Sequence, residues 1–550
     1  MADEEPPPDE FMRRRDERAL TRRRLLVTAG AGVVAAACGG RVSTLPRLAP
    51  SPSVTATATA APTASSAAAP AGVLPGEAPR QVIPSLVSPA MERENREHGE
   101  VWRLRAPARF GEVSAYCSET TYRPGDRLRL YASVRPGEGN LKIAVFRLGW
   151  YAGAGGRLMT TAAVPGPRQG HWTPRTGMVD VQRVVSQPKF GCVELQWEPA
   201  WELDIPTSWP TGVYLVRLTT TIGRQSYAPF VIDDGKPHAL LMVLPWTTYV
   251  AYNPWGGKSL YEYNSSPART VAGTPRAVRV SLDRPFEYDF GTGFLLRYEI
   301  STIRWLESQG FDVGYLTSCD LDAANGLHRR ARALLFHGHD EYWSAGMRSA
   351  VEGARDGGTG LCFLSGNTMY WQIRCDESSQ GRARRALVCY KDARIDPAAR
   401  IAPPMTTVRW IDPPVSDPQS LVTGLTYGGS IQPPAQDWVI DDPGHWVFAG
   451  LGVRKGERVP GVVGYEFDTA APASATPQGL QMVARSPVRG ADGPVPYQAT
   501  TVYRAASGAW VFNAGTIQWC WGLDNAYQRF ADQRIQRATL NVLKRMTESR

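Results

Sequence analysis

The stretch Arg332-Ala333-Leu334-Leu335-Phe336-His337-Gly338-His339-Asp340-Glu341-Tyr342-Trp343 decides the fold. Its first part, residues 332–336, is mostly apolar, as expected of a buried strand. The following residues, 344–357, have helical periodicity, and the apolar run 359–364 predicts another strand. Because two parallel strands need a crossover connection, and a helix commonly supplies it, this order of elements predicts a parallel sheet flanked by helices.

The alternation of strands and helices begins well before this stretch. Residues 239–244 and 311–316 predict two further strands, and residues 294–310 between them predict a helix. We therefore expect an α/β domain at residues 236–400. Ligands of such domains bind beyond the carboxyl ends of the strands, so the residues just after each strand are the first candidates for chemistry.

The remainder of the chain predicts an insertion and a return to the same domain. Short runs separated by turns such as Asp412-Pro413-Pro414 are typical of a β-rich insertion at residues 401–500. Residues 508–523 then predict a strand, and residues 532–546 a closing amphipathic helix. Residues 501–550 are therefore expected to complete the α/β domain.

A different pattern precedes residue 236. Short β-branched runs, separated by turn signals such as Arg123-Pro124-Gly125-Asp126, predict an immunoglobulin-like β-sandwich at residues 100–235. The expected strands are 127–134, 141–147, 213–220 and 226–232. The predicted fold class is thus α+β and multidomain, a β-sandwich followed by an α/β domain, in keeping with a length of 550 residues.

Residues 1–38 have the pattern of an export signal. Thr21-Arg22-Arg23-Arg24-Leu25-Leu26 precedes the apolar run 25–37, which is too short to span a bilayer as a helix. The string is similar to a twin-arginine signal that uses Arg22 and Arg23, and Ala35-Ala36-Ala37-Cys38-Gly39 resembles a lipobox. We expect an exported lipoprotein, anchored on the extracytoplasmic side through a lipid on Cys38. A cleaved signal in which the cysteine is incidental is the alternative.

The composition after the signal predicts a tether and no nucleic-acid partner. Residues 39–85 are rich in Ala, Thr, Ser and Pro, which cannot bury enough apolar surface to fold. The chain carries a net charge of +9, yet residues 1–38 contain seven Arg and seven acidic residues, so the excess lies in the body. There the basic residues are scattered and form no stripe with interleaved aromatic residues, which argues against nucleic-acid binding.

Seven cysteines follow Cys38. An odd count leaves at least one thiol free. Cys117 with Cys192, and Cys375 with Cys389, could pair in an oxidising compartment, but their spacing alone does not decide the pairing.

Reactive side chains are densest in the heptad His337–Trp343, at the end of the third predicted strand. If side chains alternate there, His337, His339 and Glu341 share one face and Asp340 and Tyr342 the other. Imidazole and carboxylate groups suit a metal ion or a general acid and base pair. The alternative is that the polar residues only hold a loop in place. Candidate catalytic residues are His337, His339, Asp340 and Glu341.

The next predicted strand ends in Ser365-Gly366-Asn367-Thr368-Met369-Tyr370-Trp371, which adds Asn367 as a catalytic candidate. Each of the two strand ends carries a Tyr-Trp pair. Because phenolate binds ferric iron well, Tyr342 and Tyr370 near a carboxylate would make an iron site; aromatic packing of loops is the alternative. Serine hydrolase chemistry with Ser365 and His339 competes, although Gly-x-Ser-x-Gly is absent.

Two further regions are candidates for the site. Thr248, Tyr249, Tyr252 and Asn253 follow the first predicted strand of the α/β domain, in a loop that could cover the site or could equally be scaffold. Glu466 lies in the β-rich insertion, where a buried carboxylate would need a partner or a metal to stay charged.

These strings resemble the large (β) subunit of N,N-dimethylformamidase and the exported proteins that carry its C-terminal domain. The resemblance covers roughly residues 100–545. The strings that carry it are residues 243–253, His337 to Trp343, Gly366-Asn367 with Tyr370-Trp371, Cys389-Tyr390-Lys391-Asp392, and Gly515-Thr516-Ile517-Gln518-Trp519.

The resemblance implies a glutamine-amidotransferase-like α/β domain and hydrolysis of an amide C–N bond at one iron ion held by two tyrosines and a glutamate. Tyr342 and Tyr370 lie in matching strings, with Tyr298 as an alternative. The acidic segment expected before Trp410 has no carboxylate here, so Glu341 or Glu466 would have to replace the glutamate, or no iron binds.

The predicted function is therefore a tethered formamidase-like hydrolase of a small-molecule amide. In it, a metal-bound water would be the nucleophile, and His339 or Glu341 would handle the proton. The alternative is a non-catalytic envelope protein that binds glycan or peptide through aromatic loops. A small partner subunit or an oligomer is compatible with either reading.

Overall fold

A seven-stranded sheet lies at the centre of the computed structural model, which describes residues 83–548 except 110, 174–176, 266–274, 432–433, 490–496 and 528–529. Its strand order is β15-β13-β16-β18-β27-β26-β25. The strands are β13 (His238–Leu244), β15 (Val313–Thr317), β16 (Ala331–His339), β18 (Gly360–Gly366), β25 (Gln481–Pro487), β26 (Tyr497–Arg504) and β27 (Trp510–Asn513).

This central sheet is mixed. The pairs from β15 through β27 are parallel, whereas β25, β26 and β27 pair antiparallel. The predicted α+β class with a parallel sheet is confirmed. The strand predicted at 508–523 is shorter than expected, because a 3-10 helix, η10 (Ile517–Gly522), follows β27. Strand β25, within the range expected to form an insertion, belongs to this sheet.

Helices cover both faces of the central sheet. On one face Met242, Leu335 and Leu364 pack in the same core as α4 (Glu299–Ser308) and α9 (Gln533–Glu548). On the other face Val243, Phe336 and Phe363 pack with α6 (Ala345–Asp356). Burial on both faces explains why these strands are continuous apolar runs in the sequence rather than alternating ones.

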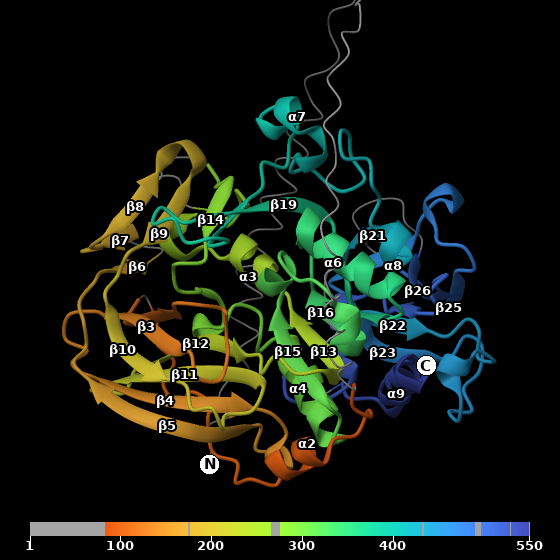
Figure 1. Cartoon of the computed structure of the whole chain (residues 1–550), viewed down its shortest axis with the longest axis horizontal. Coiled ribbons are helices and arrows are strands. Elements are labelled where there is room, and N and C mark those ends of the chain that lie inside the picture. The colour runs from red at the N-terminus through yellow and green to blue at the C-terminus, as the bar shows by residue number, and fades with distance from the viewer. Residues whose placement is uncertain are drawn as a thin grey trace, which may run out of the picture. The chain divides into compact units, whose positions relative to one another are not determined.

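Two more sheets pack face to face in the N-terminal part, seen in orange and yellow in Figure 1. Their shared core includes Leu130, Val145, Val216 and Phe230. We call them the N-terminal sheet pair; its immunoglobulin-like topology stays a prediction. The strand orders are β1-β3-β10 and β2-β12-β11-β4-β5. The strands are β1 (Val113–Cys117), β2 (Thr121–Tyr122), β3 (Arg127–Val134), β4 (Leu141–Leu148), β5 (Gly156–Val164), β10 (Pro199–Asp204), β11 (Gly212–Thr220) and β12 (Gln225–Ile232).

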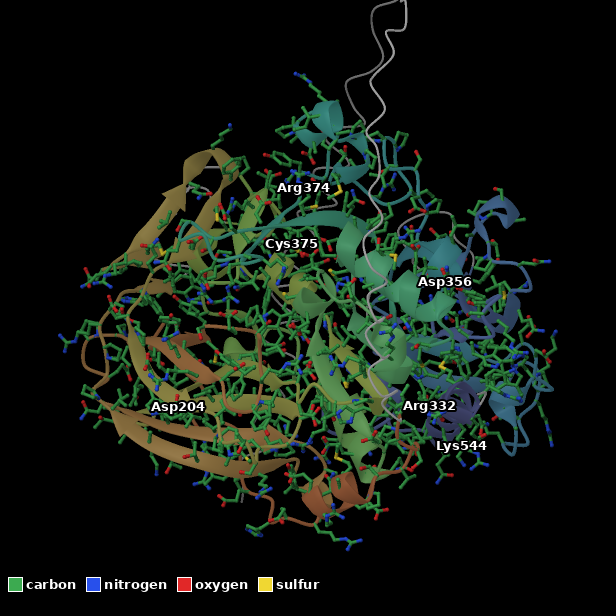
Figure 2. All side chains as sticks on the ribbon, viewed as in Figure 1. Asp204, Arg332, Asp356, Arg374, Cys375 and Lys544 are labelled. Atoms are coloured by element: carbon green, nitrogen blue, oxygen red, sulfur yellow. The ribbon has the colours of Figure 1, made fainter. Side chains whose placement is uncertain are left out.

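A four-stranded sheet lies against the carboxyl end of the parallel strands. Its order is β14-β20-β19-β17, with β14 (Arg279–Ser281), β17 (Tyr342–Ser344), β19 (Trp371–Asp376) and β20 (Ala386–Val388). Figure 2 marks Arg374 and Cys375 on β19, the strand that begins with Trp371. Because β17 starts inside the heptad, this sheet fixes the loop that carries the candidate residues.

The remaining elements are short. The paired strands are β6 (His171–Thr173) with β7 (Gly177–Val179), β8 (Val184–Gln187) with β9 (Cys192–Leu195), β21 (Leu425–Ser430) with β24 (Glu466–Ala470), and β22 (Gln436–Val439) with β23 (Arg458–Val463). The helices are α2 (Pro89–Glu94), α3 (Trp246–Tyr252), α5 (Ser318–Leu321), α7 (Ala398–Ile401) and α8 (Ser420–Thr423). The 3-10 turns are η1 (Tyr151–Gly153), η2 (Pro188–Phe190), η3 (Trp255–Gly257), η5 (Tyr288–Gly291), η6 (Leu327–Arg329), η7 (Pro403–Met405), η8 (Trp446–Phe448) and η9 (Ala473–Ala475).

Several expectations about targeting concern residues that the structure does not describe. Arg22, Arg23, Cys38 and nearly all of the expected tether lie outside the described residues. Within the described ranges, no helix has the length and apolar character needed to cross a bilayer.

The seven cysteines that follow Cys38 all lie in the described part of the chain, and all are free thiols. The possible pairs Cys117 with Cys192 and Cys375 with Cys389 are therefore wrong for this structure. Burial raises the pKa of the Cys389 thiol to about 11.

Candidate functional site

The heptad His337–Trp343 is held by helix α3. The hydroxyl of Thr248 accepts the backbone N–H of Glu341 at 3.0 Å, and the hydroxyl of Thr247 donates to the carbonyl of Tyr342 at 2.8 Å. The region after the first strand could have covered the site or served as scaffold; residues 246–252 form a helix that anchors the heptad. Gly338 has φ +55°, and a side chain there would meet Tyr298, so the extended backbone breaks at this glycine and side chains do not simply alternate.

His339 lies between two carboxylates. Its Nε2 is 2.9 Å from Glu466 Oε2 and 3.2 Å from Glu341 Oε2, both ion-pair distances without hydrogen-bond geometry. Its Nδ1 is 3.1 Å from the hydroxyl of Tyr465. No sequence pattern indicated that residues from β24 and from the end of β16 would meet, yet this contact supplies the partner that a buried Glu466 requires.

The charges of His339, Glu341 and Glu466 stabilise one another. Burial opposes a charge on His339, but the carboxylates of Glu466 and Glu341 outweigh burial and raise the pKa of His339 to about 10. Burial would likewise raise the pKa of Glu341, but His339 and Lys391 hold it below its ordinary value. At neutral pH the site therefore contains an imidazolium and ionised Glu341. His339 is a proton donor there, not a base.

Two tyrosines also bind the Glu341 carboxylate. Tyr252 donates to Glu341 Oε2 at 2.7 Å, Tyr261 donates to Oε1 at 2.8 Å, and the two hydroxyl oxygens are 2.9 Å apart. Burial raises the pKa of both phenols. Tyr252 was only a weak candidate in the sequence and Tyr261 was missed, because its neighbours form no motif. The ammonium of Lys391, also missed, lies 3.3 Å from the centroid of the Tyr261 ring.

The end of strand β18 adds Asn367 to the site. Its Nδ2 donates to Glu466 Oε2 at 2.9 Å, and its backbone N–H donates to Asp468 Oδ1 at 2.8 Å. Burial raises the pKa of Asp468 to about 7. Asn367, Met369 and Lys391 are all non-glycine residues with positive φ. Such backbone strain clusters at functional sites, where the surrounding structure must maintain it.

Three other polar residues of the heptad region are buried without full pairing. Burial lowers the pKa of His337 to about 3, and neither ring nitrogen has a hydrogen-bond partner among the described residues. Burial raises the pKa of Asp340 to about 7, and Trp343 Nε1 donates to its Oδ1 at 3.0 Å. Glu299, the first residue of α4, accepts from Tyr249 at 2.5 Å, and burial raises its pKa. His337 therefore makes no hydrogen bond to His339, Glu341 or Glu466.

The structure does not bring the proposed iron ligands Tyr342, Tyr370 and Glu466 together. Tyr342 packs against Tyr252 and Tyr261, and its hydroxyl has no hydrogen bond within the described ranges. The Tyr370 hydroxyl lies 3.5 Å from Arg409 Nη1.

Two other residues that the sequence suggested have partners outside the cluster of His339, Glu341 and Glu466. The alternative iron ligand Tyr298 stacks on Trp521. The Ser365 hydroxyl contacts that of Thr368 at 2.7 Å rather than His339, so no serine nucleophile is formed.

A different set of two tyrosines and one glutamate does converge. The oxygens of Tyr252, Tyr261 and Glu341 approach one another at 2.7 to 2.9 Å, the spacing of neighbouring donors around a small cation. No group of three His, Cys, Asp or Glu side chains in the described part of the chain is placed to hold a metal ion. A metal at this position would therefore depend on the phenols.

Fold and site together define a class: a mixed α/β protein with a buried acid–base cluster at the carboxyl end of a parallel sheet. Residues 142–529 match the family described as N,N-dimethylformamidase beta subunit-like, C-terminal. The chain belongs to this family. A curated relative, the N,N-dimethylformamidase beta subunit of Paracoccus aminophilus, is 24% identical over 221 residues. The match covers 33% of this chain and 28% of that protein, so the chain spans under a third of the relative's length.

Two solved structures match short parts of the chain at low identity. Pseudomonas fluorescens alkylpurine DNA glycosylase AlkC, bound to DNA containing an abasic site analog, is 12% identical and matches 22% of this chain and 30% of its own, with a TM-score of 0.13. The sporulation control protein Spo0M from Bacillus subtilis is 11% identical and matches 26% and 54%, also with a TM-score of 0.13. Scores this low carry no argument about fold or function.

Proposed function

We propose that the chain is a hydrolase of an amide or related C–N bond, acting at the cluster of His339, Glu341 and Glu466. The observation that carries the proposal is the imidazolium held between two carboxylates, in a chain that belongs to the N,N-dimethylformamidase beta subunit-like family. Glycan and nucleotide chemistries have no comparable support from the residues around this cluster.

In this mechanism Glu466 takes a proton from the attacking water, because its carboxylate reaches the edge of the cluster with about 12% of its side chain exposed. His339 gives a proton to the departing nitrogen. It is protonated at neutral pH because the two carboxylates raise its pKa to about 10 despite burial, so it can act as the general acid. Glu466, 2.9 Å away, returns its proton to His339 after the C–N bond has broken. Asn367 orients Glu466 through the hydrogen bond from its Nδ2.

The iron that the family resemblance implies fits Tyr252, Tyr261 and Glu341, and these residues would hold it. Bound there, it would supply Lewis-acid polarisation of the substrate carbonyl. Whichever side chains bind it, His339 and Glu466 keep the proton-transfer roles, because His339 Nε2 lies 2.9 Å from Glu466 Oε2 and neither residue belongs to this set.

The test is release of dimethylamine from N,N-dimethylformamide, followed by nuclear magnetic resonance, together with a panel of N-alkyl formamides and acetamides. We expect turnover of at least one member and its loss in His339→Gln. The control is His445→Gln, a histidine that contacts Gln481 outside the cluster. Absence of C–N hydrolysis across the whole panel, with folded protein, would contradict the proposal.

We propose further that the body is exported and tethered at Cys38, with a flexible segment between the lipid and the first described element. Cys38→Ser should release the protein from the membrane fraction, and Arg22→Lys with Arg23→Lys should retain it in the cytoplasm. If Cys38→Ser stays in the membrane fraction, the protein is not tethered through a lipid on Cys38.

A second candidate, non-catalytic binding of a glycan, is favoured by a pocket beside the N-terminal sheet pair. Tyr116 stacks on Tyr131 with ring centroids 4.9 Å apart, Trp197 packs beside them at 5.8 Å, and Arg382 completes the lining. Because Tyr116 and Trp197 are buried, the pocket surface is mainly polar, and glycan hydroxyl groups would bind to Arg382 and its polar neighbours. Titration calorimetry with soluble oligosaccharides, repeated on Tyr131→Ala, separates this function from hydrolysis.

A further inference from the structure

One loop of the molecule presents large apolar side chains to solvent. Residues 392–406, which include α7 and η7 and which we call the tip, stand out from the body at the top of Figure 1. Within the tip, Ile395 is 54% exposed, Ile401 84% and Met405 37%. Ile401 is the most exposed large apolar side chain in the described part of the chain. Exposed apolar residues that gather on one short segment mark an interaction site, whereas scattered ones do not.

The tip is held by buried hydrogen bonds. The side chain of Asp396 is completely buried, and it accepts from Arg374 Nη1 at 2.8 Å and from the backbone N–H of Thr407 at 2.7 Å. Arg374, marked in Figure 2, also donates to the carbonyl of Met405 at 2.9 Å and so joins the two ends of the tip. A buried carboxylate beneath exposed isoleucines is the reverse of the usual distribution, so the fold itself directs the apolar side chains outward.

The charge left on the surface of the tip is positive. Of its two carboxylates, Asp392 pairs with Arg394 at 2.6 Å and Asp396 pairs with Arg374 at 2.8 Å. Arg400, next to Ile401, is exposed and has no carboxylate partner among the described residues. An unpaired arginine beside exposed aliphatic side chains is complementary to a surface that is both apolar and anionic.

The size and composition of the tip favour a membrane over a protein partner. A stable protein interface takes about 20 to 30 residues from each side and is enriched in aromatic side chains. The tip has 15 residues, and none of them is aromatic. In a membrane contact, by comparison, a few aliphatic side chains enter the boundary between headgroups and acyl chains, and cations meet the anionic lipids.

We propose that the tip inserts into the surface of an anionic lipid bilayer, with Ile395, Ile401 and Met405 below the headgroups and Arg400 at the phosphates. This inference rests on the proposed export and lipid tether, which place the chain beside a membrane. The tip is then a second membrane contact, and it fixes which side of the body faces the bilayer.

The tether is long enough for this orientation. Figure 1 shows α2, the first described helix, at the opposite end of the body from α7. Cys38 precedes Ile83, the first described residue, by 45 positions. A chain of that length reaches up to about 150 Å, whereas a body of this size has a radius of gyration of about 23 Å. A lipid on Cys38 and the tip can therefore occupy the same membrane.

Photocrosslinking of the full chain on vesicles of phosphatidylethanolamine and phosphatidylglycerol tests the contact. A benzoylphenylalanine crosslinker is placed at position 401 or, as the matched control, at position 222, where Ile222 is 61% exposed between β11 and β12. We expect lipid adducts, detected by mass spectrometry, from position 401 and none from position 222. Adducts to a second copy of the chain, or no lipid adducts from position 401, would overturn the proposal.

Vesicle sedimentation of Cys38→Ser measures the affinity of the tip without the lipid, so the tip and the tether are tested separately. Adding Ile401→Asp should weaken binding about tenfold or more, because the apolar side chain no longer leaves water. Adding Ile222→Asp should change nothing.

The charge of the tip is tested in the same assay. Arg400→Gln should weaken binding to the anionic vesicles about fivefold and leave binding to phosphatidylcholine vesicles unchanged. Circular dichroism checks that each variant folds, and hydrolysis of amides in solution should be unaffected by Ile401→Asp, so a failure here is distinct from a failure of the hydrolase proposal. Equal vesicle binding with and without Ile401→Asp would show that the tip does not enter the bilayer.

Discussion

Two buried clusters of charge in this molecule differ in how fully their polar atoms are hydrogen-bonded. Arg147, on β4 of the N-terminal sheet pair, contacts Glu307 of α4 at 2.8 Å, and both side chains are completely buried. All three guanidinium nitrogens of Arg147 donate, to Glu307, to Tyr151 and to the carbonyl of Thr211. Glu307 also accepts from Tyr315. Every polar atom of this ion pair has a partner.

The cluster around His339 is equally buried but incompletely paired. Among the described residues, Asp340 Oδ2, Tyr342 Oη and Asn367 Oδ1 are buried without a hydrogen bond. An unmade hydrogen bond in the interior costs about 1 to 3 kcal/mol, so a purely structural cluster would not retain several together. The difference indicates that the Arg147 pair joins two parts of the fold, whereas the His339 cluster keeps donors and acceptors ready for a ligand.

Breaking the fully hydrogen-bonded ion pair of Arg147 and Glu307 should have the largest effect on stability. Arg147→Met leaves the Glu307 carboxylate buried without its counterion, and we expect a loss of about 3 to 5 kcal/mol in the free energy of unfolding. Urea denaturation followed by tryptophan fluorescence measures the loss. The double variant Arg147→Met with Glu307→Leu should recover a substantial part. A loss below about 1 kcal/mol in the single variant would show that the pair is not desolvated as the structure indicates.

Neutralising Glu466, the partly exposed carboxylate of the His339 cluster, should affect catalysis rather than stability. Glu466→Gln removes the proposed base, and we expect the rate of amide hydrolysis to fall about 100-fold or more with little change in the denaturation midpoint. Glu352→Gln, which removes a carboxylate paired with Arg348 on α6, is the matched control and should leave the rate unchanged. A Glu466→Gln protein that is fully active would place the base elsewhere.

The elements that the sequence predicted well are those in which one local pattern dominates. Strand β3 has the predicted bounds, and β13, β16 and β18 agree to within three residues, because apolar runs end at clear turn signals. Helix α6 also agrees, with Ser344 accepting at its first turn and Gly357 following its end. The helix expected from residue 294 starts instead at Glu299, since residues 294–298 form turns despite their periodicity.

The site was predictable only in part, for a geometric reason. His339, Glu341 and Asn367 follow strands that a parallel sheet brings together, so their proximity followed from the predicted topology. Tyr261 and Tyr252 reach Glu341 from 80 and 89 positions away in the sequence, on a connection whose path no local pattern encodes. The iron set Tyr342, Tyr370 and Glu466 stays a prediction, because a Tyr-Trp pair at each strand end says nothing of where each hydroxyl points.

A second fully paired cluster, around His238, allows the comparison of charge clusters to be tested by changing the pH. His238 of β13 contacts Asp312 at 3.1 Å and Asp234 at 3.0 Å, and these partners, against the opposing effect of burial, raise its pKa to about 9. Because the folded pKa is above the unfolded value, this stabilisation is complete below about pH 6.5 and is lost as the pH rises through about 9.

The measurement is the difference in unfolding free energy between the native protein and His238→Gln at several pH values. We expect the difference to fall by on the order of 2 kcal/mol between pH 6 and pH 10. His445→Gln, whose ring contacts Gln481 rather than a carboxylate, should show no such trend. A difference that stays constant with pH would mean that His238 is not held as a cation by Asp234 and Asp312.

The smallest effect on stability should come from removing one of the unpaired atoms. Tyr342→Phe deletes a buried hydroxyl that makes no hydrogen bond in the described structure, so we expect the free energy of unfolding to stay the same or to rise by about 1 kcal/mol, because the desolvation cost of that hydroxyl is removed. Tyr261→Phe deletes a hydroxyl bonded to the charged Glu341, and should cost about 1.5 to 3 kcal/mol. The same two variants decide between the iron sets: a tyrosinate-to-iron absorption band formed on iron loading should survive Tyr342→Phe and disappear in Tyr261→Phe. If the band instead disappears in Tyr342→Phe and survives in Tyr261→Phe, Tyr342 is the iron ligand. Its hydroxyl would then lack a hydrogen bond because it is available to bind the metal.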